Sequence, residues 1–169
     1  MASEFHQLFI KEVKRRLIDE GKSRLVTCLG MLSQEEIWHR PNANSNSVGN
    51  LVLHLCGNVR QWLISGLGGA PDNRQRQLEF DEKGPIPTET LLHLLDNTLS
   101  EAEAVLDRLT DEDLTRPVTI QGFDETGISV LVHVVEHFSY HVGQVTYYVK
   151  LTKDRQTNYY EGLDLDVTK

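Results

Sequence analysis

Apolar residues recur at helical spacing in four long segments of the chain, and no segment shows the sustained alternation typical of a strand. The segments cover residues 3–32, 47–67, 88–109 and about 126–152. Most connections between them are short, which favours helices that pack side by side. The pattern therefore predicts an all-α fold, an up-and-down four-helix bundle with a long loop between its second and third helices, at residues 70–87. A loop of this length can carry a crossover along the bundle.

Hydroxyl side chains mark where the helices are expected to begin, because a serine or threonine oxygen can accept a hydrogen bond from the first turn. Ser3, Ser47 and Thr88 are predicted to cap the first three helices. Thr126 or Ser129 is predicted to begin the fourth.

Shorter elements are expected between the long helices. The sequence predicts a helical turn at residues 34–38, another at 110–114, and an extended piece or hairpin at 116–123. The connection 70–87 is charged, and loops of this length are often functional in a compact domain. The polar tail, residues 153–169, is expected to pack on the bundle or on a second subunit.

Length and composition fit one globular domain over residues 1–169, with its core helices within residues 3–152. Hydrophobic residues make up 39% of the 169 residues, enough for a core. The net charge of −8 argues against binding to nucleic acids or anionic lipid. No apolar run is long enough for a membrane span, and Cys28 and Cys56 are expected as free buried thiols. We therefore expect a cytoplasmic protein without a secretory signal.

Three of the seven histidines follow one another at intervals of four residues in the last helical segment. His133, His137 and His141 therefore lie on one face of that helix. Two neighbours in this row can hold one metal ion, but the outer two are about 12 Å apart at about 1.5 Å per residue and cannot easily share it. A third ligand must come from elsewhere, and His54 lies in the leucine-rich second segment. The residues alone leave open which pair binds, and whether His54 is a ligand or a hydrogen-bonded buried histidine.

Two alternatives compete with this interpretation. Residues 133–137 match H-x-x-E-H, the inverted zincin pattern, in which Glu136 would be the base. Those enzymes are much larger and of mixed α/β class, and a short motif arises readily by chance. Alternatively, the histidines are simply clustered in an interaction protein without metal. His6, His39 and His93 show no pairing pattern and are expected at the solvent or the rim.

The order of these motifs along the chain resembles a known family. The run H-x-x-E-H-x-x-x-H-x-G-Q-V over residues 133–145 resembles the last-helix signature of the DinB-like (DinB/YfiT-like) family. The segment 47–55, S-V-G-N-L-V-L-H-L, resembles the family's second-helix motif. The resemblance covers residues 3 to about 152, nearly the whole chain. It implies a four-helix bundle in which three histidines and water hold a divalent ion, often nickel or zinc. It also implies that two copies of the chain form a homodimer.

Carried onto this chain, the resemblance assigns His54, His137 and His141 as the metal ligands. His133 matches a recurrent histidine of the family that is usually not a ligand, so it is expected to line or support the site. Glu136 is adjacent to a ligand and should point about 100° away from it, at about 3.6 residues per turn. It is expected to orient a ligand, or to face a neighbouring helix or solvent.

Other polar side chains are expected around a substrate. Asn58 is one turn after His54 and shares its face, so it is expected near water or substrate. Arg74 and Arg76 are candidates to bind an anionic substrate over the mouth of the site, or are solvated loop residues. The run R-x-R-x-x-E-F over residues 74–80 departs from the better-known members and indicates an uncharacterised branch.

The resemblance implies a metal-dependent enzyme acting on a small molecule. Characterised members of the family carry out either transfer or isomerisation with a low-molecular-weight thiol, or metal-assisted hydrolysis. The reaction and the substrate of this chain stay open. The alternative is a non-catalytic, stress-associated or metal-sensing bundle with a structural ion, because no protein base is obvious in the sequence.

Overall fold

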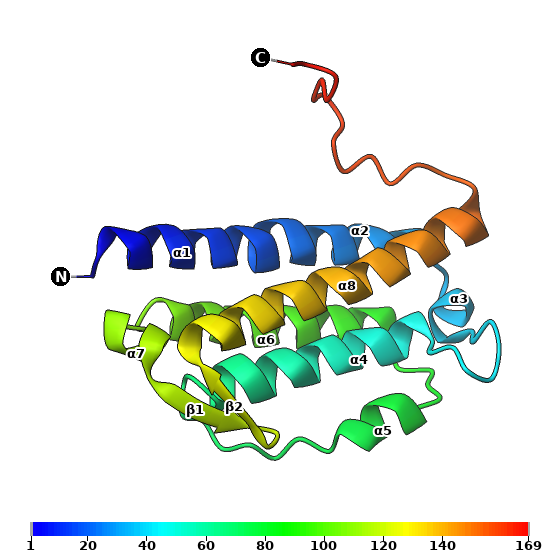
Figure 1. Ribbon diagram of the computed structural model, residues 1–169. Helices are drawn as coiled ribbons and strands as arrows, with labels where there is room; N and C mark the ends of the chain where they lie inside the picture. Colours follow the sequence, from blue (N-terminus) through cyan, green and yellow to red (C-terminus); the bar gives the residue numbers. More distant parts are fainter. Residues whose placement is uncertain (1, 169) are drawn as a thin grey trace.

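The computed structural model describes residues 2–168, and four long helical rods dominate it (Figure 1). The first rod runs from α1 (Glu4–Lys14) through the π-helical segment η1 (Arg15–Lys22) into α2 (Ser23–Met31). The second joins α4 (Val48–Val59) to the π-helical segment η2 (Arg60–Ser65). The third is α6 (Thr88–Leu106) and the fourth is α8 (Gly127–Lys153). The predicted all-α four-helix bundle is confirmed.

The long connection is a crossover. It leaves the second rod at one end of the bundle and returns along the outside to the other end, where α6 begins (Figure 1). The carbonyl of Gly68, just past the second rod, accepts a hydrogen bond from Arg108, just past α6, at 2.8 Å. Helices α4 and α6 therefore run in the same direction, whereas the first and last rods run opposite to them. The long loop carries the crossover that the sequence left open, in place of a strict up-and-down order.

Hydroxyl caps begin three of the rods where they were predicted. Ser3, Ser47 and Thr126 each accept a hydrogen bond from the backbone N–H three residues on. The prediction is wrong for Thr88, which is the first residue of α6 itself. Its backbone N–H and its hydroxyl both donate to Gln34 Oε1, each at 3.0 Å, so it ties α6 to the turn that follows α2.

The predicted short elements are also present. They are α3 (Gln34–Trp38), α7 (Asp111–Thr115) and an antiparallel hairpin of β1 (Pro117–Ile120) with β2 (Phe123–Thr126). In the hairpin Pro117 pairs with Thr126 and Ile120 with Phe123. The sequence did not predict the helix α5 (Arg76–Asp81) inside the long connection.

Buried apolar side chains from all four rods form one core. Its largest fully buried members are Leu17, Leu25, Leu29, Ile37, Leu55, Leu63, Ile64, Leu91, Leu95, Leu99, Leu106 and Phe138. Leucines at helical spacing face inward because burying them removes apolar surface from water. Within residues 2–168, no helix is long and apolar enough to cross a membrane.

The first part of the C-terminal tail packs on its own bundle. The Tyr159 hydroxyl lies 2.9 Å from Cys28 Sγ and 2.8 Å from Thr146 Oγ1. Both Cys28 and Cys56 are free and buried, as predicted. The tail therefore joins α2 to α8 on the side of the bundle away from α5 (Figure 1).

Candidate metal centre

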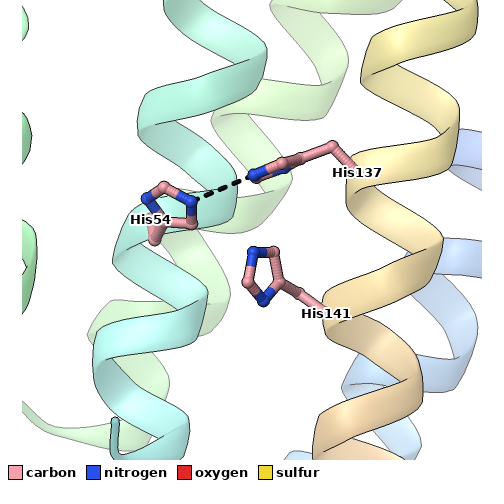
Figure 2. A group of neighbouring side chains, drawn as sticks. All are labelled: His54, His137 and His141. Atoms are coloured by element: carbon pink, nitrogen blue, oxygen red, sulfur yellow. Dashed lines mark hydrogen bonds between the residues drawn. The ribbon is translucent and has the colours of Figure 1, made fainter.

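Three histidines meet in the seam between α4 and α8 (Figure 2). One ring nitrogen from each of His54, His137 and His141 lies within 4.8 Å of the other two. Nε2 of His54 and Nε2 of His137 are 3.0 Å apart. Two ligands of a tetrahedral zinc site, each about 2.0–2.1 Å from the ion, are about 3.3 Å apart. The three nitrogens therefore fit a single divalent ion after small shifts.

Burial disfavours the protonated form of His137 and His141. His54 is 4% exposed. Burial, and next the neighbouring His141 and His54, lower the pKa of His137 to about 3. Burial also lowers the pKa of His141, against a hydrogen bond with Gln144 that raises it. A metal ligand must be an unprotonated imidazole, so the lowered pKa values favour the ligating form of His137 and His141.

A buried ion pair lies behind His54. Glu79 Oε2 is 2.9 Å from His54 Nδ1. Arg74 Nε donates to Glu79 Oε1 at 2.7 Å, and Arg74 Nη2 donates to Oε2 at 2.9 Å. The Arg74 side chain is only 4% exposed and the Glu79 side chain 11%. Burial alone would raise the pKa of Glu79, but the hydrogen bonds from Arg74 and His54 lower it, so the carboxylate is charged.

Helix α5 brings Glu79 to this position. Asn50 Nδ2, in the first turn of α4, donates to the Glu79 carbonyl at 2.9 Å. The Phe80 ring packs 4.7 Å from the His54 ring. A Cβ atom at Gly57 would overlap the Glu79 carboxylate, so the glycine leaves room for this carboxylate against α4. The long connection therefore forms one wall of the histidine cluster.

The other two histidines have different supports. His141 Nδ1 donates to Gln144 Oε1 at 2.8 Å, which leaves its Nε2 unprotonated. His137 Nδ1 is buried and has no hydrogen-bond partner in the described part of the chain. The second ring nitrogen of His54 therefore has a charged partner, that of His141 has a neutral partner, and that of His137 has none in the described part of the chain.

His133 lies one turn outside the cluster and is bound to other groups. Asn58 Nδ2 donates to His133 Nε2 at 3.2 Å, and the Trp62 ring stacks on His133 with 3.9 Å between ring centres. The Asn58 side chain is buried, and its Oδ1 lacks a hydrogen-bond partner within residues 2–168. His133 and Asn58 therefore form a polar pair beside the cluster, on the same two helices.

The structure separates the remaining candidates. Glu136 is exposed, on a different face of α8 from the ligands. Arg76 is exposed and lies over the Phe80 ring at 4.8 Å. Arg74 is buried and its guanidinium is occupied by Glu79, so the expectation of two free arginines over the mouth is wrong for Arg74.

The inverted zincin interpretation also fails on this geometry. It requires His133 and His137 to share an ion beside Glu136, whereas the group that meets here contains His54 and His141 instead of His133. A separate correction concerns His6, which is buried 3.7 Å from the Asp111 carboxylate and does not lie at the rim.

Sequence reasoning missed Glu79 and Gln144 as parts of the site. Both were inside quoted motifs, the R-x-R-x-x-E-F run and the G-Q pair after His141. A charged pair five residues apart in a long connection was a usable signal. Its burial depends on the docking of α5 against α4, which spacing alone does not predict.

A cavity of about 420 Å³ lies between α8 and the loop before α4, and the three candidate ligands do not line it. Gln144 lines it, together with Leu51 from α4 and Tyr148 from α8. Because Gln144 also holds His141, this cavity is one side chain away from a candidate ligand. Its size suits a small molecule.

Comparisons with known proteins agree with this fold. A family model described as "Protein of unknown function (DUF1572)" matches residues 4–161. A DinB-like protein from Bacillus cereus ATCC 10987 superposes with a TM-score of 0.62 at 19% identity, covering 80% of this chain and 87% of that one. A DinB-like protein from Bacillus subtilis gives 0.64 at 21% identity, covering 88% and 94%. A conserved protein from Enterococcus faecalis gives 0.71 at 17% identity, covering 91% and 100%.

At these identities the solved structures establish the fold alone. The chain has the fold of DinB-like proteins, as its motifs predicted, within a family that has no characterised function. No curated protein matches this chain.

Proposed function

The chain belongs to the family described as "Protein of unknown function (DUF1572)", and we propose that it binds one divalent metal ion through His54, His137 and His141. The observation that carries this proposal is the meeting of three ring nitrogens within 4.8 Å of one another. They come from two helices; His54 is buried and the other two are half-buried, and desolvation lowers the pKa of His137 and His141. Burying three imidazoles together without a shared partner is costly, and one ion satisfies all three.

The donor set favours a transition metal such as nickel or zinc over magnesium or calcium. Imidazole nitrogen suits zinc, copper, iron and nickel, whereas magnesium and calcium prefer oxygen ligands. Glu79, the nearest carboxylate described above, is engaged by Arg74 and His54 and is not offered to the ion. The second partners of His54 and His141 resemble those that orient ligands in known metal sites.

We further propose that the centre is catalytic, in a metal-dependent enzyme with a small-molecule substrate. Three neutral ligands leave the ion its double charge and a position for another group. When bound, such an ion supplies a Lewis acid for water, a thiol or a carbonyl group. The reaction classes in view are transfer or isomerisation with a low-molecular-weight thiol, and hydrolysis. Gln144, which holds His141, also lines a cavity of about 420 Å³.

A specific observation favours a non-catalytic alternative. Glu79 is neutralised by Arg74 and Glu136 is exposed, so neither carboxylate is placed to take a proton from a substrate. His133 is the nearest remaining base, and its Nε2 accepts from Asn58. In this alternative the ion only stabilises the bundle.

Metal uptake by stripped, tag-free protein tests the proposal. The protein is titrated with Ni²⁺ or Zn²⁺ in competition with a coloured chelator, and then assayed for hydrolysis and for thiol transfer. We expect uptake of one equivalent. An activity that disappears on stripping and returns with metal supports the enzyme, whereas an activity that survives complete stripping contradicts it. Failure to take up either metal contradicts metal binding itself.

A further inference from the structure

The two ring nitrogens of His54 face different partners. Nε2 faces His137 and the rest of the cluster, at 3.0 Å. Nδ1 faces the Glu79 carboxylate, at 2.9 Å. A ring that binds metal through one nitrogen keeps its proton on the other, so the partner at Nδ1 determines whether Nε2 is free to bind metal.

Two groups compete for Nδ1, and the contacts distinguish them. Arg74 Nη2 is 3.2 Å from His54 Nδ1 and can only donate a hydrogen bond. The same Nη2 donates to Glu79 Oε2 at the shorter distance of 2.9 Å. Glu79 Oε2 can only accept, and it is closer to Nδ1 than the arginine is. The proton therefore lies on Nδ1, and Nε2 carries a lone pair directed at the cluster.

Arg74 makes a buried carboxylate tolerable at this place. A carboxylate is costly to bury unless it is paired and fully hydrogen-bonded. Arg74 provides a two-point contact to Glu79, and its Nη1 donates to Gln61 Oε1 at 3.0 Å. The space for the pair exists because residue 57 is glycine. Several side chains of α4 and the connection are thus arranged around one carboxylate.

We propose that Glu79 is a positioning residue of the metal centre, held by Arg74, which fixes His54 with its proton on Nδ1 and its Nε2 lone pair toward the ion. This inference rests on the proposed metal binding. It assigns a function to the long connection 70–87, which supplies both members of the pair. It also makes His54 the most strongly supported ligand, because Gln144 behind His141 is uncharged and His137 has no second partner.

The test compares variants that separate positioning from burial of charge. Glu79→Met removes the acceptor but leaves Arg74 buried and unpaired, so the double variant Arg74→Met with Glu79→Met is made beside it. Glu79→Gln keeps one acceptor oxygen. Asp81→Asn is the matched control, because it removes one negative charge from an exposed residue of the same helix.

Two readouts are measured on tag-free protein. Nitrogen-15 NMR of the metal-free histidine rings, with His54 assigned by its loss in His54→Gln, reports which nitrogen carries the proton. Competition with a chelator reports Zn²⁺ affinity. We expect Nδ1–H in wild type, Glu79→Gln and Asp81→Asn, and a mixture of tautomers in the double variant. Zn²⁺ affinity should fall about 10- to 100-fold in the double variant and stay unchanged in Asp81→Asn.

The contrary outcomes are distinct. A metal-free wild type with the His54 proton on Nε2 would overturn this inference. So would a folded double variant that binds Zn²⁺ as tightly as wild type. A wild type that binds no metal would overturn the proposed function together with it, whereas the first two results leave metal binding intact.

Discussion

Nε2 of His54 and Nε2 of His137 lie 3.0 Å apart across the seam between α4 and α8, although the residues are 83 positions apart in the chain. Without an ion, one of these nitrogens must donate a proton to the other. With an ion between them, both offer lone pairs and the proton moves to Nδ1 of His137, which has no partner in the described part of the chain. The seam can therefore close in both forms, with the ion replacing one hydrogen bond.

Metal removal should lower the melting temperature, because an ion that binds only the folded protein stabilises it. At a free Zn²⁺ concentration of about 1,000 times Kd, the stabilisation is about 4 kcal/mol. For a chain of this size that corresponds to roughly 10 °C. Calorimetry with Zn²⁺ and with excess chelator measures the difference. Superimposable melting curves would argue against an ion that bridges α4 and α8.

Arg74→Met should destabilise the metal-free protein by about 3 kcal/mol, because it leaves the Glu79 carboxylate buried without its counter-charge. Arg76→Met is the control, since Arg76 is exposed and only lies over Phe80. Its loss should cost less than about 1 kcal/mol. Urea unfolding in the presence of chelator gives both free energies. Equal losses of unfolding free energy in the two variants would show that the buried ion pair does not stabilise the protein more than the exposed Arg76 does.

Gly57→Ala should displace the Glu79 carboxylate and weaken the docking of α5 on α4, because the added Cβ would overlap that carboxylate. We expect faster proteolysis within residues 70–87 and weaker metal binding. The control is Gly30→Ala in α2, where an added Cβ meets no atom within 4 Å. That change should stabilise the protein by up to about 1 kcal/mol through helix propensity. A Gly57→Ala protein with wild-type proteolysis and metal affinity would contradict the close approach of α5.

Cys56 should resist alkylation in the folded protein. Burial raises the pKa of its thiol to about 12, so the reactive thiolate is scarce even at pH 9. Iodoacetamide is expected to modify Cys56 only after urea unfolds the chain, as followed by mass spectrometry of the peptide. Rapid modification of Cys56 in native protein at pH 9 would contradict this. The prediction implies that Cys56 does not supply the thiol of any transfer reaction.

The long helices and the histidine row could be predicted because their signals are local. Residues four apart on one helix share a face, so His137 and His141 follow from spacing alone. The assignment of His54 as the third ligand depended on the resemblance of the chain's motif order to that of a known family, because no local sequence signal links His54 to α8. The direction of α6 depends on the path of the connection 70–87, and the composition of that connection does not predict its path.

The side chains that surround the histidine cluster could not be predicted from residue spacing. Arg74 appeared as a free loop cation, yet it is buried because Glu79 and Gln61 accept its hydrogen bonds. The helix α5 has only six residues and weak periodicity, so its docking is visible only in three dimensions. His6 was placed at the rim for a similar reason, since its burial near Asp111 depends on how α1 meets α7.

The most direct test is elemental analysis of tag-free wild type beside four single variants. His54→Ala, His137→Ala and His141→Ala each remove one candidate ligand, and His133→Ala removes a histidine of the same helical row that lies outside the group. We expect about one nickel or zinc per chain in wild type and in His133→Ala, and loss of the metal in the other three. Metal that is absent from wild type and not taken up on titration, or that is retained in all three ligand variants, would contradict the assignment.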